Sequence, residues 1–221
     1  MRTRLLVIAS ALLMTAALAL VFLFVPTDAG QGIIQRIFYF HVPVAWVAFL
    51  AFFVTFVAGI IYLVKRNLFW DSLASRSAEI GLIFTTLVLV TGSIWARSEW
   101  NTWWTWEARL TTSLVLWFIY LSYFVIRAFI SDPAMRARFA AVVGIVGFID
   151  VPIVMFSVNN RGLHPGGENN SIFHEGLGGL MLVTLIVSVF AFTALYLMFL
   201  DISTRIEEDR REIKMIRDSK E

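Results

Sequence analysis

The sequence predicts an all-α membrane protein, a bundle of six transmembrane helices with both termini in the cytoplasm. Of its 221 residues, 59% are hydrophobic and only 15% are charged, which is typical of an integral membrane protein. Apolar runs recur at about the 20-residue length that spans a bilayer. Lys and Arg gather in alternate connections between these runs, which is the pattern that orients membrane proteins.

The six predicted spans follow one another with no soluble domain between them. The first run resembles the start of a secretory signal, but it is longer than the roughly 7–15 apolar residues of such a signal, so we expect it to be retained. Pro152 is expected to kink the fifth helix, because proline removes a backbone donor. The predicted spans are Leu5–Val25, Val42–Val64, Ile80–Trp95, Thr112–Ile130, Phe139–Val158 and Leu177–Leu200.

Charge decides the orientation of the bundle. Of the 18 Lys and Arg residues, 14 lie at the N-terminus, in the second–third and fourth–fifth connections, and in the C-terminal tail. The positive-inside pattern therefore predicts cytoplasmic termini. We expect residues 1–200 to form the transmembrane domain and residues 201–221 to form a charged cytoplasmic tail. The tail is either a solvated helix or a docking element for a partner ATPase.

This topology brings all three histidines to the outer face. His41 stands two residues before Pro43, and proline suits the first turn of a helix, so His41 is expected at or just before the outer end of the second helix. His164 lies in a loop rich in Gly and Asn, and His174 precedes the sixth helix. Each could be an ordinary interfacial or solvated side chain, or a ligand of a metal or haem.

Four tryptophans fall within seven residues on the same face, in a Trp-rich segment of about residues 95–111. These are Trp100, Trp103, Trp104 and Trp106. They could form an aromatic belt that anchors helix ends. Alternatively, their spacing is compatible with one face of an interfacial helix, which would offer a flat platform to a planar apolar ligand.

Charged side chains accompany the tryptophans and could bind the edge of such a ligand. Arginine pairs well with carboxylates. Haem combines a flat apolar ring, an iron that accepts histidine and two propionates, so it fits this set of residues. The charged candidates on the outer face are Glu107 and Arg109 and, beyond them, Arg36 and Arg97.

Three stretches also carry a family resemblance that covers nearly the whole chain. "WNTWWTWEARLT" resembles the tryptophan-rich W-G-x-x-W-x-W-D signature of haem-handling membrane proteins in cytochrome c biogenesis. "RIFYFHVPVAW" and "VNNRGLHPG" resemble the histidine-bearing segments of the CcmC-type members. The resemblance implies that His41 and His164 are axial ligands of a non-covalently bound b-type haem. Asn101 and Glu107 depart from the usual Gly and Asp of the signature.

The resemblance also implies a function and partners. Proteins of this family hold haem at the periplasmic face of the bacterial inner membrane and pass it to a haem chaperone, CcmE, beside the subunits of an ABC transporter. A small single-helix membrane subunit is a further expected partner, and a nucleic acid is not. This is binding rather than catalysis, and the sequence has no phosphate-binding G-x-x-x-x-G-K-[ST] loop, so ATP hydrolysis would come from a partner.

Two other functions compete with haem handling. A small-molecule or proton transporter would depend on Asp150, an ionisable residue about midway along the fifth span, with the tryptophans as an anchor only. A membrane metalloenzyme would use His164, His174 and Glu175, but these residues lack a recognisable ligand spacing. Because the chain has no Cys, thiolate metal sites and disulfides are excluded.

Overall fold

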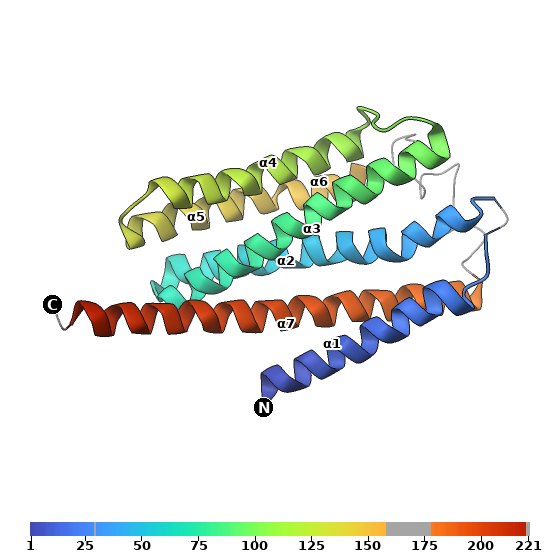
Figure 1. Ribbon diagram of the computed structural model, residues 1–221. Coiled ribbons are helices and arrows are strands. Elements are labelled where there is room, and N and C mark those ends of the chain that lie inside the picture. The colour runs from blue at the N-terminus through green and yellow to red at the C-terminus, as the bar shows by residue number, and fades with distance from the viewer. Residues whose placement is uncertain (29, 158–177, 220–221) are drawn as a thin grey trace.

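The computed structural model describes residues 1–28, 30–157 and 178–219, and these residues form helices with no β-strand among them (Figure 1). Six helical segments in these ranges are long and apolar enough to cross a membrane, which confirms the predicted bundle. The elements are α1 (Arg2–Ala19), a π-helical turn (Leu20–Phe24), a 3₁₀ helix (Ile33–Ile37), α2 (Phe38–Lys65), α3 (Leu68–Trp100), α4 (Ala108–Phe129), α5 (Pro133–Phe148), α6 (Asp150–Phe156) and α7 (Gly179–Asp218).

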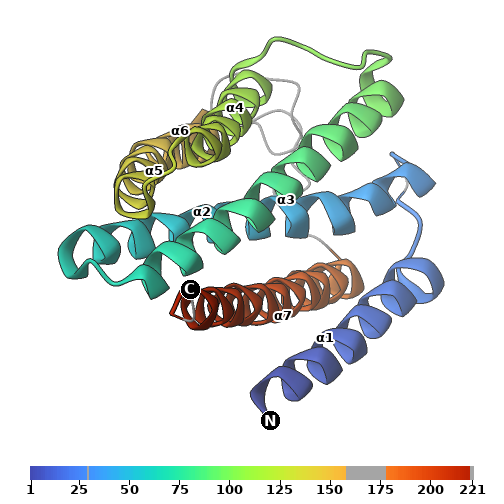
Figure 2. The same ribbon diagram turned by 60° about the vertical axis from the view of Figure 1, so that its left-hand side comes forward.

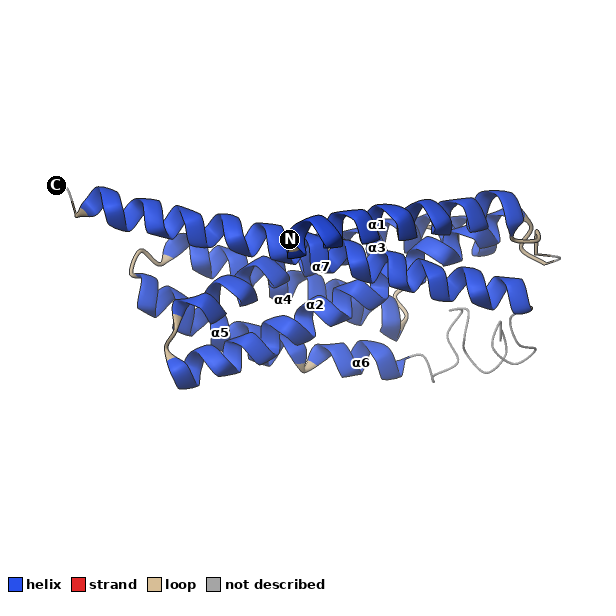
Figure 3. Ribbon diagram, turned by 90° about the horizontal axis from the view of Figure 1, so that it is seen from below, coloured by secondary structure: helices blue, strands red, loops and turns tan. Residues whose placement is uncertain are grey.

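The helices α2 and α3 form the middle of the bundle. Figure 2 shows α4, α5 and α6 on one side of this pair and α1 and α7 on the other. The last turns of α7 project beyond the other helices (Figure 3). The last turns of α7 lie at one end of the bundle, which we call the terminal end, and the α3–α4 connection lies at the opposite end, which we call the pocket end (Figure 1).

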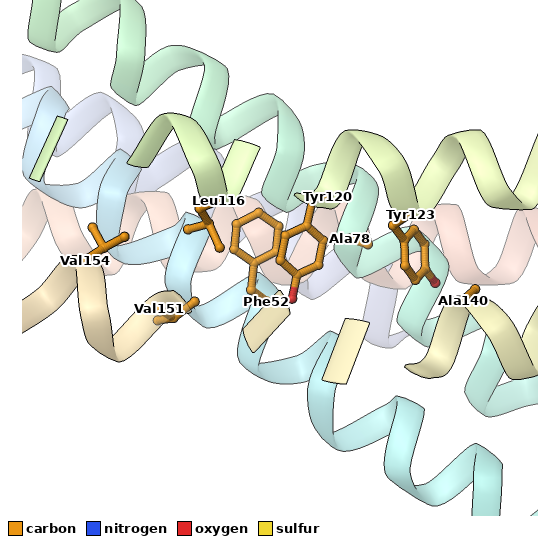
Figure 4. Packing of buried hydrophobic residues seen from close by; sticks show 8 residues of the cluster. All are labelled: Phe52, Ala78, Leu116, Tyr120, Tyr123, Ala140, Val151 and Val154. Carbon is orange, nitrogen blue, oxygen red and sulfur yellow. The ribbon is translucent and has the colours of Figure 1, made fainter. Parts of the chain in front are cut away.

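Aromatic side chains fill the core between α2, α3, α4 and the α5–α6 pair (Figure 4). The rings of Phe52 and Tyr120 are stacked, with centroids 3.6 Å apart. Both side chains are fully buried. The Tyr120 hydroxyl donates a hydrogen bond to the Gly144 carbonyl oxygen at 3.2 Å, which satisfies a polar group that would be costly to bury alone.

Small residues let the helices approach closely at this core. A Cβ atom on Gly147 would lie 2.7 Å from the Ile119 side chain of α4, and a Cβ on Gly81 would lie 2.5 Å from the Phe52 ring. Membrane helices commonly pack through such small residues, because lipid offers no hydrophobic force to hold them together. The glycines of α5 therefore serve helix packing.

Charged residues are paired at the terminal end. Arg127 of α4 donates two hydrogen bonds to the Asp71 carboxylate of α3, at 2.6 and 3.1 Å. Arg211 of α7 reaches the same carboxylate at 3.3 Å, and Arg2 lies 3.2 Å from Asp201. The basic segments that the sequence predicts on one side of the membrane therefore gather at one end of the bundle.

The third helix is longer than predicted because its charged residues have partners. It begins at Leu68 instead of Ile80, after Asn67 caps its first turn by accepting a hydrogen bond from the Phe69 amide. Asp71 and Arg76 lower the local hydropathy, so the hydropathy pattern places the start of this span too late in the sequence. Arg76 pairs with Glu207 of α7 at 3.0 Å, which lets the helix continue through this charged stretch.

The fifth span is interrupted where proline predicted a kink. The helix divides at Ile149 into α5 and α6, and Pro152 lies in the first turn of α6. Because proline has no N–H, it cannot complete the hydrogen bond to the carbonyl four residues earlier, at Phe148. The sixth span, in contrast, continues without a break through Leu200 into the tail, as part of α7.

The buried ion network predicts a large stability difference between two acidic residues of α3. Asp71 is 4% exposed, and Asp71→Ala leaves Arg127 without its carboxylate. Removing one partner of a buried ion pair costs about 3–5 kcal/mol. We expect a clearly lower midpoint of thermal unfolding for the detergent-solubilised variant.

The matched control is Glu79→Ala. Glu79 pairs with Arg76 near the same end of α3, but its side chain is 49% exposed. Exposed pairs contribute about 0–1 kcal/mol, so this variant should unfold close to the wild-type temperature. If Asp71→Ala also unfolded close to the wild-type temperature, the network at Asp71 would not support the bundle.

Candidate functional site

A pocket lies at the pocket end of the bundle, between α2, α3 and the first turns of α4. Its walls combine apolar side chains with a histidine, two tryptophans and a pair of opposite charges. The residues that carry the chemistry are His41 of α2, Trp95 and Trp100 of α3, and Glu107 and Arg109 at the start of α4. Val88, Leu89 and Leu110 supply apolar surface beside them. The fold thus brings together a predicted histidine, a predicted tryptophan and the predicted charged pair Glu107 and Arg109.

His41 is buried in the wall of this pocket, with 8% of the residue exposed. Its Nδ1 atom lies 2.8 Å from the Thr91 hydroxyl oxygen. The Trp95 ring meets the imidazole edge-on, with centroids 5.8 Å apart. Among the described residues, no hydrogen-bond partner contacts the other ring nitrogen, Nε2. The imidazole is therefore held on one side and available on the other.

The predicted position of Pro43 was wrong. Pro43 lies inside α2, not in its first turn, and His41 is the fourth residue of the helix. The reason is the 3₁₀ helix Ile33–Ile37, which runs directly into α2 and starts the helical path earlier. His41 therefore lies deeper in the bundle than a residue at a helix end.

The predicted interfacial helix of the Trp-rich segment was also wrong. Trp100 is the last residue of α3, and residues 101–107 are an irregular connection to α4. Asn101 ends the helix in the left-handed conformation, with φ 54°. Asparagine tolerates this conformation better than most residues, so the sequence stops the helix within the tryptophan cluster.

The four tryptophans consequently do not share one face. Trp100 lines the pocket with His41, whereas Trp103 lies with Trp117 in a groove on another surface of α3 and α4. Trp106 is 77% exposed and meets the half-buried Trp104 edge-on, with centroids 5.9 Å apart. Only one of the four predicted platform residues is therefore in contact with the pocket.

The charged candidates separate in the same way. Arg109 and Glu107 line the pocket. Arg97 instead donates a hydrogen bond to the Asn101 carbonyl oxygen at 2.6 Å, and its guanidinium lies over the Trp103 ring. The Nε atom of Arg36 is buried without a hydrogen-bond partner among the described residues. Arg109 is thus the arginine that the fold brings to the pocket.

Several polar atoms near the pocket are buried without hydrogen-bond partners among the described residues. They include the indole nitrogens of Trp95 and Trp104 and the hydroxyl oxygens of Thr105 and Thr111. Buried polar groups are normally paired, because an unpaired one costs about 1–3 kcal/mol. Of these four residues, Trp95 lines the pocket, so its indole N–H is available to a polar ligand group there.

Three further residues were predicted as candidates for the site. His164 and His174 lie outside the described residues. Asp150 is buried at the start of α6, with its Oδ2 atom unpartnered among the described residues, and it is not among the residues that line the pocket.

Sequence reasoning missed Thr91 and Gly92, which contact His41 from α3. A Cβ atom on Gly92 would lie 3.2 Å from the Cε1 atom of His41. The available signal was the glycine itself, because a glycine inside a long helix costs about 1 kcal/mol relative to alanine and usually has a packing reason. Thr91, next to it, offered no signal without knowledge of the partner helix.

The donor set fits a haem in kind. It offers a buried imidazole, aromatic walls, apolar side chains and one arginine. The pocket is narrow, with a cavity volume of about 40 Å³, so it can accept the edge of a ligand but cannot enclose a porphyrin.

Comparison with known proteins points to one family. The family model CcmC, described as heme exporter protein C, matches residues 2–218. A heme exporter protein C of Bradyrhizobium diazoefficiens is 36% identical over 192 residues, which cover 86% of this chain and 73% of the relative. Those of Haemophilus influenzae and Paracoccus denitrificans are 34% and 32% identical, over 86% and 85% of this chain and 78% and 79% of the relatives.

Proposed function

This chain belongs to the heme exporter protein C family, and we propose from that premise that it binds haem at the outer face of the bacterial inner membrane and delivers it for cytochrome c maturation. The observation that carries the proposal is the buried His41, which shares a pocket with Trp100 and Arg109. A lone interfacial histidine has no need of such surroundings.

His41 and His164 are the proposed axial ligands. A neutral imidazole nitrogen is a common ligand of haem iron. His41 supports this role because Nε2 has no partner among the described residues. His164 rests on the resemblance of its segment to the family, as does the b-type, non-covalent form of the haem. His174 is a second candidate from the same connection.

The remaining side chains bind and orient the ring. Trp95 and Trp100 offer aromatic contact area, and Arg109 offers a guanidinium to a propionate. Because the pocket is too narrow to enclose a porphyrin, these side chains would hold one edge of a bound ring and leave the rest accessible to a partner protein. The bound haem supplies an iron that accepts two nitrogen ligands, and the protein holds the haem without transforming it.

Delivery requires partners. The proposed acceptor is the haem chaperone CcmE at the periplasmic face, beside ABC transporter subunits and a small single-helix subunit. The positive charges at the terminal end support a cytoplasmic location for both termini. α7 carries exposed Ile213, Met215 and Ile216 beyond the ion pairs of Arg211, and this stretch of the tail is available to a cytoplasmic ATPase.

The test is the absorption spectrum of the protein purified in detergent from cells that make haem. The wild type should carry haem. His41→Ala and His164→Ala should each lose most of it, because each removes one iron ligand. Added imidazole should restore the six-coordinate spectrum of a His41→Gly variant, since it can replace the missing ring.

Asp150→Asn is the matched control, as it alters a buried polar residue outside the pocket. It should keep wild-type haem content, and loss of haem would place Asp150 at the site. If both histidine variants retained wild-type haem while remaining folded, the ligand assignment would be wrong. If the wild type never bound haem, transport through Asp150 would become the better account.

The different positions of Arg109 and Arg97 provide a second prediction. Arg109→Gln should weaken haem binding about 10–100-fold in a haem titration, because a hydrogen bond to a charged group contributes roughly 1.5–3 kcal/mol. Arg97→Gln is the control, since Arg97 lies over Trp103 away from the pocket and should leave the affinity nearly unchanged. Equal weakening by the two substitutions would remove Arg109 from the site.

A further inference from the structure

We propose that Thr91 and Gly92 of α3 are positioning residues for His41: Thr91 fixes the imidazole with its proton on Nδ1, and Gly92 makes the space for the ring. Nε2 is thereby kept as the nitrogen that binds iron. This inference rests on the proposed haem-binding function, and it names the residues that prepare the ligand before haem arrives.

The hydrogen bond from Thr91 to its own helix supports one direction for its contact with His41. Its hydroxyl lies 2.7 Å from the carbonyl oxygen of Leu87, one turn earlier in α3, and donates to it. A hydroxyl has one hydrogen and two lone pairs. With its hydrogen directed to Leu87, the Thr91 oxygen can only accept from a second partner. That partner is His41 Nδ1 at 2.8 Å.

The tautomer of His41 follows from this geometry. In the proposed arrangement, Nδ1 carries the proton and donates it to the Thr91 oxygen. A neutral imidazole has one protonated nitrogen, so Nε2 has a free lone pair. Only a nitrogen with a free lone pair can bind iron. Thr91 therefore acts as the outer partner that metal-binding histidines commonly have, in the place often taken by a carboxylate or a backbone carbonyl.

Gly92 controls the position of the ring as Thr91 controls its proton. A Cβ at this position would lie 3.2 Å from His41 Cε1 and 3.9 Å from Nδ1. The first distance is shorter than ordinary van der Waals contact, so an alanine would push the ring by a few tenths of an ångström. Trp95, three residues further along α3, holds the imidazole edge-on at 5.8 Å. Three residues of α3, Thr91, Gly92 and Trp95, therefore confine the His41 ring.

The first experiment reads the tautomer in the haem-free protein. The chain has three histidines, so protein labelled with ¹⁵N-histidine gives few signals, and His41→Ala identifies those of His41. We expect wild-type His41 to show a protonated Nδ1 and an unprotonated Nε2. Thr91→Val removes the acceptor at nearly constant shape and should shift His41 toward the Nε2-protonated form. Thr91→Ser keeps the hydroxyl and should restore the wild-type signals.

The second experiment titrates the same variants with haem. Thr91→Val should bind haem about 10–100-fold more weakly, the usual effect of removing an outer partner of a metal ligand, and Thr91→Ser should bind nearly as the wild type does. Gly92→Ala should weaken binding without changing the tautomer. The control is Gly59→Ala in α2, where the added Cβ would meet its neighbours at 3.5 Å or more.

The outcomes separate this inference from the function on which it rests. If haem-free wild-type His41 carried its proton on Nε2, or if Thr91→Val left the tautomer and the haem affinity unchanged, Thr91 would not position His41. The His41→Ala result would then still stand for haem ligation. If His41→Ala kept wild-type haem affinity, the ligand assignment would fail whatever the tautomer.

Discussion

The packing of α2 against α3 is the contact on which the rest of the structure depends. The two helices are joined by a two-residue connection, Arg66–Asn67, so they must run side by side along their length. The Ser77 hydroxyl donates to the Ala51 carbonyl oxygen at 2.7 Å, and Gly81 admits the Phe52 ring. The two groups of outer helices then pack against opposite sides of this pair. The same contact continues to the pocket end, where it sets His41 against Thr91.

Ion pairs gather at the terminal end of the bundle. At the terminal end, Asp71 is shared by Arg127 and Arg211, and Arg76 meets Glu207, so buried charge is compensated within the chain. At the pocket end, the indole of Trp95 and the hydroxyl of Thr111 have no partner among the described residues. The ion pairs therefore join α3, α4 and α7 at the terminal end, away from the candidate pocket.

Because α3 ends at Trp100, the tryptophan cluster does not form a single helical face. A continuous helix would have made the four rings one platform. The left-handed Asn101 divides them, so that Trp100 faces the pocket while Trp103 and Arg97 pack together elsewhere. The sequence allowed either an aromatic belt or a ligand platform, and the structure is compatible with both roles for different tryptophans. One ring lines a candidate ligand site, and exposed rings such as Trp106 suit the membrane surface or a partner protein.

The sequence by itself determined the helical class, the number of spans and the kink near Pro152, because apolar length and proline chemistry act locally. It also singled out His41, Trp100 and Arg109, because imidazole, indole and guanidinium groups can be recognised as potential haem-binding groups without knowledge of their neighbours. Only the tertiary structure decided that Arg97 and Trp103 lie away from the pocket, and that Thr91 and Gly92 contact His41 from a helix fifty residues further along the chain. The start of α3 depended on partners as well, because Asp71 is paired there with Arg127 and Arg211 of other helices. Local pattern sets which segments are helical, whereas long-range pairing sets which side chains meet.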